Sequence, residues 1–127
     1  MKENTGLIKR KGTSGYVLVR AREWNLGNKL RKKDFLIFRM PQSKGGLPQS
    51  KVKPIDLIAM KSELKRPIFI QVSKRLRDIT QEEIDELMKV SEIAGADPIL
   101  AYVKDKEKER SKWRFKDPKT MKETKLY

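Results

Sequence analysis

The sequence predicts an α/β protein in which a central mixed sheet of about five strands is flanked by helices. Short apolar runs rich in β-branched residues indicate strands, and longer segments with apolar residues at helical spacing indicate helices. These segments follow one another in the order helix, three strands, helix, two strands. The expected strands cover residues 35–39, 54–60, 67–74, 98–103 and 112–116. A chain of 127 residues is long enough to form one domain with a buried core.

The two middle strands, 54–60 and 67–74, are expected to form an antiparallel hairpin because only a short charged segment separates them. Asp56 lies within the first of these strands, and Gln71 and Ser73 lie within the second. Gln71 and Ser73 share one strand face, since side chains alternate across a strand. A polar group on a mostly apolar strand face costs free energy unless it is paired or used. We therefore expect a functional site here.

The first helix is expected to begin at Thr13 or Ser14, each of which can act as an N-cap, and to run to about Lys33. Its core-facing stripe contains Tyr16, Val19, Leu26 and Leu30. Glu23 falls within this stripe. A carboxylate in that position is either an ion-paired group at the edge of the core or part of a functional site.

A capping box predicts the second helix, with Thr80 as the N-cap and Glu83 three residues later. The helix is expected to end near Ala94, because Gly95 is a typical C-terminal signal. Its outer face is acidic, comprising Glu82, Glu83, Asp85, Glu86 and Glu92. Phosphate would be repelled there, so we expect a solvated face that points away from nucleic acid.

The charge is strongly positive, since 31 basic and 17 acidic side chains give +14 at neutral pH. Such an excess favours a polyanionic partner, most simply nucleic acid. The alternative is a charged surface that serves solubility or thermal stability. Residues 1–12 are expected to form a flexible basic arm, 13–116 the domain, and 117–127 a loosely held tail.

Cysteine and histidine are both missing from the sequence. This excludes disulfides, thiolate or imidazole metal sites and Ser-His nucleophile systems. Metal chemistry would need oxygen ligands and a hard cation such as Mg²⁺. No apolar run reaches the roughly 18–20 residues that span a bilayer, and no signal peptide is visible. We expect a soluble cytoplasmic protein with no membrane partner.

Glu23, Asp56, Gln71 and Ser73 form the candidate site. Adjacent antiparallel strands can bring Asp56 opposite Gln71. Carboxylates on neighbouring elements suit a Mg²⁺ ion that polarises a phosphodiester and lowers the pKa of a water molecule. The Gly-rich basic loop at 40–53 could offer backbone N–H groups and charge to phosphate, or it is a plain connecting loop.

Several segments then match a known pattern in order and spacing, over most of residues 13–116. They are Glu23 in the first helix, Arg39-Met-Pro-Gln-Ser43, Lys44-Gly-Gly46, Pro54-Ile-Asp56, Gly95-Ala-Asp-Pro-Ile-Leu-Ala101 and Lys112-Trp-Arg-Phe115. Together they resemble the archaeal Holliday junction resolvases of the PD-(D/E)xK nuclease superfamily. The resemblance implies a restriction-endonuclease-like fold. It also implies a homodimeric, Mg²⁺-dependent endodeoxyribonuclease that cuts branched DNA, such as four-way junctions, in DNA recombination and repair.

The resemblance also implies roles for individual residues. Glu23, Asp56 and Gln71 would hold the metal, Ser43 would contact the scissile phosphate, and Ser73 would complete the catalytic set. The DNA-binding residues would be Lys9, Arg10, Lys11, Arg39, Lys44, Lys51, Lys53 and Lys74.

The chain departs from the family at one motif. Where the family has Glu-x-Lys, this chain has Gln71-Val72-Ser73, with Lys74 one place late. A shift of one residue points Lys74 to the opposite face of the strand, unless a bulge re-aims it. Loss of one charge-stabilising group typically lowers the rate by about 10²–10³. The alternatives are therefore a catalytically impaired DNA-binding protein of the same fold, or a basic RNA-binding protein.

Overall fold

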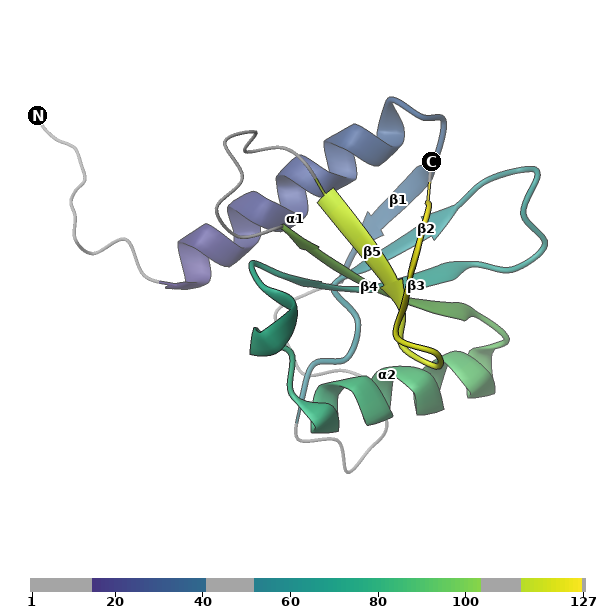
Figure 1. The fold of residues 1–127 in the computed structure, drawn as a ribbon. Helices are drawn as coiled ribbons and strands as arrows, with labels where there is room; N and C mark the ends of the chain where they lie inside the picture. Colours follow the sequence, from purple (N-terminus) through teal and green to yellow (C-terminus); the bar gives the residue numbers. More distant parts are fainter. Residues whose placement is uncertain (1–14, 41–51, 104–112, 127) are drawn as a thin grey trace, which may run out of the picture.

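The computed structural model describes residues 15–40, 52–103 and 113–126, and within the first helix it describes side chains from Arg22 onward. The elements in chain order are α1 (Gly15–Arg31), β1 (Leu36–Arg39), β2 (Leu57–Met60), β3 (Ile68–Ser73), the short 3₁₀ helix η1 (Leu76–Asp78), α2 (Gln81–Ala94), β4 (Asp97–Val103), β5 (Trp113–Asp117) and β6 (Lys122–Thr124). The sheet runs between α1 and α2, which lie on its opposite sides (Figure 1).

The sheet is mixed, as predicted, with strand order β1-β2-β3-β4-β5-β6. Only the β3–β4 pair is parallel among these six strands, and the other neighbours are antiparallel. Parallel neighbours cannot be joined by a tight turn, so the chain crosses between them through η1 and α2. The predicted fold class is confirmed, with one strand more than the expected five.

The additional strand lies in the segment that we expected to be a loosely held tail. Lys122–Thr124 pairs with β5 in antiparallel register, after a turn in which the Met121 N–H donates to the Asp117 carbonyl at 2.7 Å. The sequence did not reveal β6 because all three of its residues are exposed. Without a buried face, its charged side chains show no apolar alternation.

Two apolar cores flank the sheet. On the α1 side, Leu26 and Leu30 pack with Ile68, Ile70 and Val72 and their neighbours. On the α2 side the core contains Ile55, Phe69, Ile79, Ile84, Leu87, Val90, Ala96 and Leu100. The side chains of β3 therefore alternate between the two cores as its sequence predicts.

The ends of α2 follow the predicted signals. The Glu83 N–H donates to Thr80 Oγ1 at 3.1 Å, and the Thr80 N–H donates to Glu83 Oε1 at 2.9 Å, which forms the capping box. The helix ends at Gly95, whose φ of 72° and ψ of 34° place it in the left-handed region. This helix positions η1 and its own first turn beside the carboxyl end of β3, where the candidate site lies.

Candidate active site

The four described members of the predicted catalytic set line one pocket with a volume of about 230 Å³, together with Lys53 of the predicted DNA-binding set. Glu23 comes from α1, Asp56 from the residue before β2, and Gln71 and Ser73 from β3. The rest of the lining is Lys53, Val72, Asp78, Ile79 and Glu83. The structure therefore brings together the residues that the sequence places on three separate elements.

Asp56 is positioned by an irregularity in the β2–β3 pairing. Ile70 is the register partner of Leu57, yet its carbonyl also accepts the Asp56 N–H at 2.8 Å. Two residues facing one is the arrangement of a β-bulge. Beyond this point the Val72 N–H donates to Asp56 Oδ2 at 2.7 Å, so a carboxylate takes the place of a backbone carbonyl. Asp56 was expected inside the strand, and it lies one residue before β2 begins.

The pKa of Asp56 is raised from 3.8 to about 7. Burial is the largest cause, because the residue is only 5% exposed and a buried charge is poorly solvated. The Val72 hydrogen bond lowers the pKa, the nearby Glu23 raises it, and Lys53 lowers it. A carboxyl group that titrates near neutral pH inside a pocket is typical of functional sites.

Glu23 is fully buried, and neither of its carboxylate oxygens accepts a hydrogen bond from the described residues. Its charge is instead balanced by two ion pairs, with Arg39 Nε at 3.7 Å and Lys53 Nζ at 4.0 Å. Glu23 is therefore ion-paired and also lines the pocket, and its part in a functional site stays a prediction.

Lys53 lies beside the two carboxylates of the pocket, which the sequence does not indicate. Its Nζ is 3.4 Å from Asp56 Oδ1, 4.0 Å from Glu23 Oε2 and 3.5 Å from the Met40 carbonyl oxygen. The sequence predicts DNA contacts for Lys53 and Arg39, and that role stays a prediction. The ion pairs with Glu23 are what sequence reasoning missed. The only available signal was the position of Lys53 three residues before Asp56.

Gln71 does not simply replace an acidic ligand. The orientation of its amide follows from the hydrogen-bond network. With its nitrogen toward the loop, Gln71 donates to the carbonyls of Lys53 at 3.1 Å and Pro54 at 2.6 Å. The opposite orientation offers one longer bond to Glu83 Oε2, at 3.5 Å. Two shorter bonds outweigh one long one, so Gln71 holds the backbone that carries Lys53 and precedes Asp56.

Ser73 lines the pocket, whereas Lys74 is exposed and does not. This agrees with the alternation of side chains along a strand. Bringing Lys74 into the pocket would need a bulge in β3, and the Ile68–Ser73 register with β4 is unbroken. Lys74 therefore does not supply the charge that Ser73 lacks.

Glu83 and Asp78 also line the pocket, and the sequence analysis did not place them there. Glu83 was expected to belong to a solvated acidic face. Its half-buried side chain instead caps α2 through Oε1 while Oε2 lies 3.5 Å from Gln71. The capping box that marked Glu83 was the signal, since it fixes the side chain at the helix start beside η1.

The donor atoms fit a hard cation. Mg²⁺ is usually held by one or two carboxylates together with water and substrate phosphate. Glu23 and Asp56 supply two carboxylates, and the oxygens of Glu23 lack hydrogen-bond donors among the described residues. No group of three or more acidic, histidine or cysteine side chains arranged around a metal position occurs in the described part of the chain. The fit therefore rests on two carboxylates.

The remaining predicted site residues lie outside the described residues. These are Ser43 of the catalytic set, and Lys9, Arg10, Lys11, Lys44 and Lys51 of the DNA-binding set.

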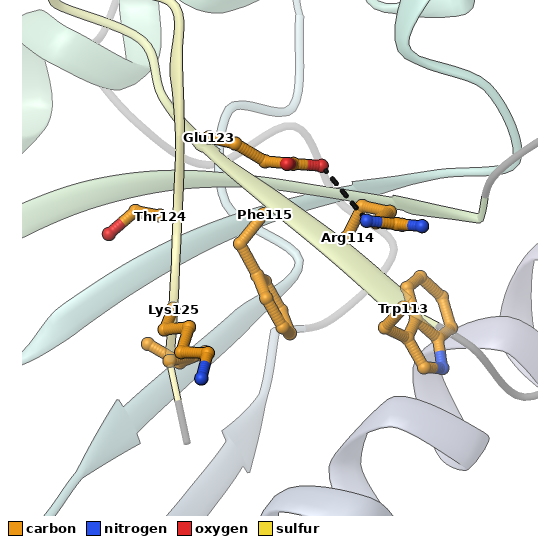
Figure 2. A pocket seen from close by; sticks show the side chains of 7 residues that line it. Trp113, Arg114, Phe115, Glu123, Thr124 and Lys125 are labelled. Atoms are coloured by element: carbon orange, nitrogen blue, oxygen red, sulfur yellow. Dashed lines mark hydrogen bonds and ion pairs between the residues drawn. The ribbon is translucent and has the colours of Figure 1, made fainter.

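A larger pocket of about 370 Å³ lies along β5 and β6 (Figure 2). It is lined by Trp113, Arg114, Phe115, Glu123, Thr124, Lys125 and Leu126. Glu123 is its only acidic lining residue among those described, and it is already paired with Arg114 at 3.4 Å. Without paired carboxylates, this pocket is a weaker candidate for hydrolytic chemistry than the one around Asp56.

Comparison with known proteins identifies the family. The family model "Archaeal holliday junction resolvase (hjc)" matches residues 10–127. The chain belongs to this family. Among solved structures, this resolvase-family chain is similar to the Holliday junction resolvase Hjc of Archaeoglobus fulgidus, an archaeal hyperthermophile. The TM-score is 0.61 and the identity 20%, covering 84% of this chain and 82% of the other. A search of curated proteins found no match.

The structural similarity supports the same mixed α/β nuclease fold. Within the described residues of this resolvase-family chain, no helix is long and apolar enough to cross a membrane.

Proposed function

We propose that this protein is a Mg²⁺-dependent, structure-selective endodeoxyribonuclease that cuts branched DNA, with the four-way junction as its substrate. Family membership supports a resolvase-like nuclease. The observation that carries the proposal is the convergence of buried Glu23 and Asp56, with Lys53 between them, in one pocket. Its roles would be in DNA recombination and repair, and its cytoplasmic location stays a prediction.

In this mechanism Glu23 and Asp56 would hold the Mg²⁺ ion. When bound, the ion polarises the phosphodiester and lowers the pKa of the attacking water. A bond forms between the water oxygen and phosphorus, the ester bond from phosphorus to a sugar oxygen breaks, and the proton reaches that leaving oxygen. Gln71 fixes the backbone of the loop before β2. Exposed cations, including Lys74, contact the DNA backbone and make binding dependent on salt.

We further propose a homodimer, because two active sites are needed to cut two strands of a junction. The apolar side chains of Leu36, Phe38 and Met60 are exposed, at 57%, 50% and 39%. The register pairs Leu36 with Met60 and Phe38 with Ile58, so these side chains share one face at the β1 edge of the sheet. Contiguous exposed apolar side chains are typical of association surfaces.

The oligomeric state tests the dimer proposal. Phe38→Thr keeps strand propensity while removing exposed apolar area. We expect light scattering to give twice the chain mass for the wild-type protein and a lower average mass for Phe38→Thr at the same concentration. Leu64→Thr, an exposed apolar position outside the strands, is the matched control. A wild-type protein that stays monomeric at micromolar concentrations contradicts the proposal.

The nuclease proposal is tested with a labelled four-way junction, the matching duplex and an RNA hairpin, with and without Mg²⁺ at two salt concentrations. We expect paired Mg²⁺-dependent cuts in the junction only. Asp56→Asn should abolish cutting and leave junction affinity within a few-fold. Asp85→Asn, the same change at an exposed acid outside the pocket, is the control. Parallel loss of affinity and cutting in Asp56→Asn would show a structural role.

A catalytically impaired junction-binding protein is the second candidate. The observation that favours it is the replacement of the family's Glu and Lys by Gln71 and Ser73. Tight, junction-selective binding without product would support it. Equal binding to junction, duplex and RNA would favour the generic basic protein instead.

A further inference from the structure

The pocket needs a positive charge that its β3 residues do not provide. Ser73 carries a neutral hydroxyl, and Lys74 points away from the pocket. Among the described residues that line the pocket, Lys53 is the only basic one. Hydrolysis of a phosphodiester places negative charge on the attacked phosphate, and a preorganised cation stabilises that charge.

Lys53 is placed for this task. Its ammonium group lies 3.4 Å from one acid and 4.0 Å from the other, so it occupies the same small space as the carboxylates that would hold the metal. Its side chain is 18% exposed. A lysine side chain that lines the pocket and is partly exposed can exchange a carboxylate partner for a phosphate oxygen.

We propose that Lys53 is the catalytic lysine of this protein, supplying from the segment before β2 the ammonium that β3 lacks at Ser73. The inference rests on the nuclease function proposed above. During hydrolysis, Lys53 Nζ would contact a non-bridging oxygen of the scissile phosphate and stabilise its growing negative charge. Lys53 keeps its proton throughout, and the proton of the attacking water ends on the leaving sugar oxygen.

The position of Gln71 links the two departures from the family motif. Its amide nitrogen donates to the carbonyls of Lys53 and Pro54. A glutamate at this position would place a carboxylate against those two carbonyl oxygens, which repel it. The amide is therefore what fixes the Lys53 backbone. One arrangement therefore accounts for both Gln71 and Ser73. Gln71 positions the backbone of Lys53, and Lys53 supplies the ammonium group that Ser73 lacks.

A purely structural counter-ion is the competing explanation. In that case Lys53 would only neutralise Glu23 and Asp56, and would compete with Mg²⁺ for them. Removing it would then strengthen metal binding and preserve or increase cleavage. The two explanations predict opposite changes in rate, so kinetics can separate them.

The experiment measures single-turnover cleavage of a four-way junction in Mg²⁺, and junction affinity by fluorescence anisotropy in EDTA. The variants are Lys53→Met, which keeps the aliphatic stem, Lys53→Arg, and the double variant Lys53→Met with Ser73→Lys. Lys65→Met is the matched control, because Lys65 is exposed in the β2–β3 connection and lies outside the pocket. Circular dichroism verifies that each variant is folded, independently of activity and of DNA affinity.

We expect Lys53→Met to lower the cleavage rate by about 10²–10³ while junction affinity changes less than about threefold. Lys53→Arg retains charge and should lose less. Adding Ser73→Lys should recover at least tenfold, because it returns an ammonium group to the pocket. Lys65→Met should match the wild-type protein.

Cleavage by Lys53→Met within threefold of wild type, or faster, would overturn the inference and leave the nuclease function standing. Equal losses of rate and affinity would overturn it too, since Lys53 would then act in binding. A folded wild-type protein that binds junctions but never cuts them would overturn the nuclease function and the inference together.

Discussion

Asp56→Asn should make the folded protein more stable at neutral and alkaline pH while it removes activity. The wild-type carboxylate is buried, and its pKa of about 7 lies well above the ordinary value of 3.8. The folded state therefore binds a proton over a pH range in which the unfolded chain has released it. Asparagine is close in shape, can still accept the Val72 N–H, and never ionises.

The magnitude follows from linkage between protonation and folding. Because the folded state binds more protons than the unfolded state between pH 3.8 and about 7, the free energy of unfolding falls as pH rises through that range. Each pH unit corresponds to about 1.4 kcal/mol, so ionising Asp56 costs the folded state about 4 kcal/mol above pH 7. The pKa of about 7 already includes the favourable interaction of Asp56 with Lys53, so this figure is the net cost of ionisation.

The assay is denaturant unfolding of wild type and Asp56→Asn at several pH values, without metal and at fixed salt. Subtracting the unfolding free energy of wild type from that of the variant at each pH removes the contributions of the other titrating groups, which both proteins share. We expect this difference to shift in favour of the variant by about 2 kcal/mol between pH 5 and pH 7, and to level off above about pH 8. A difference that stays constant across this range would refute the reasoning, because Asp56 would then have an ordinary pKa in the folded state.

Three further predictions follow from the same contacts. Because a proton on Asp56, whose pKa is about 7 without metal, competes with Mg²⁺, the Mg²⁺ concentration for half-maximal cleavage should rise as pH falls below about 7, and a half-maximal concentration that does not change with pH would count against a metal-binding role for Asp56. Gln71→Glu should lower the free energy of unfolding without metal by about 1–3 kcal/mol, because its carboxylate faces two carbonyls; urea unfolding measures this, and Mg²⁺ should restore part of the loss. Thr80→Ala should lower unfolding free energy by about 1 kcal/mol through loss of the α2 cap, with unchanged junction affinity by anisotropy.

Much of the fold was predictable because its signals are local. The apolar runs of β1 to β5, the capping box at Thr80 and the stop at Gly95 each reflect a period or a cap within a few residues. β6 was missed because its short exposed strand is held by pairing with β5, which leaves no mark in its own residues. Whether such an edge segment forms a strand depends on its pairing with a neighbouring strand and not on the β propensity of its own residues.

The acidic residues of the candidate site could be predicted from the sequence, whereas the contacts that its basic residues make could not. Glu23 and Asp56 stood out because a carboxylate in an apolar stripe or strand needs a reason to be there. Lys53 and Arg39 were predicted only as DNA contacts and not as partners of the acids, since a basic residue in a chain of charge +14 carries little information. Which of 31 basic side chains reaches a buried acid depends on the bulge at Asp56 and on the loop held by Gln71.

The basic side chains of Arg39 and Lys53 also explain how the carboxylates of the pocket can be buried. A lone carboxylate with the burial of Glu23 would take up a proton or destabilise the fold, yet Arg39 and Lys53 lie within 4.0 Å of it. Lys53 serves both acids, so any ligand that draws its ammonium away must supply positive charge in return. On the proposed function, Glu23 and Asp56 would hold a Mg²⁺ ion while a DNA phosphate contacts Lys53, so metal and phosphate together would keep the charges of the site balanced. Phosphate and metal should therefore bind cooperatively at this site.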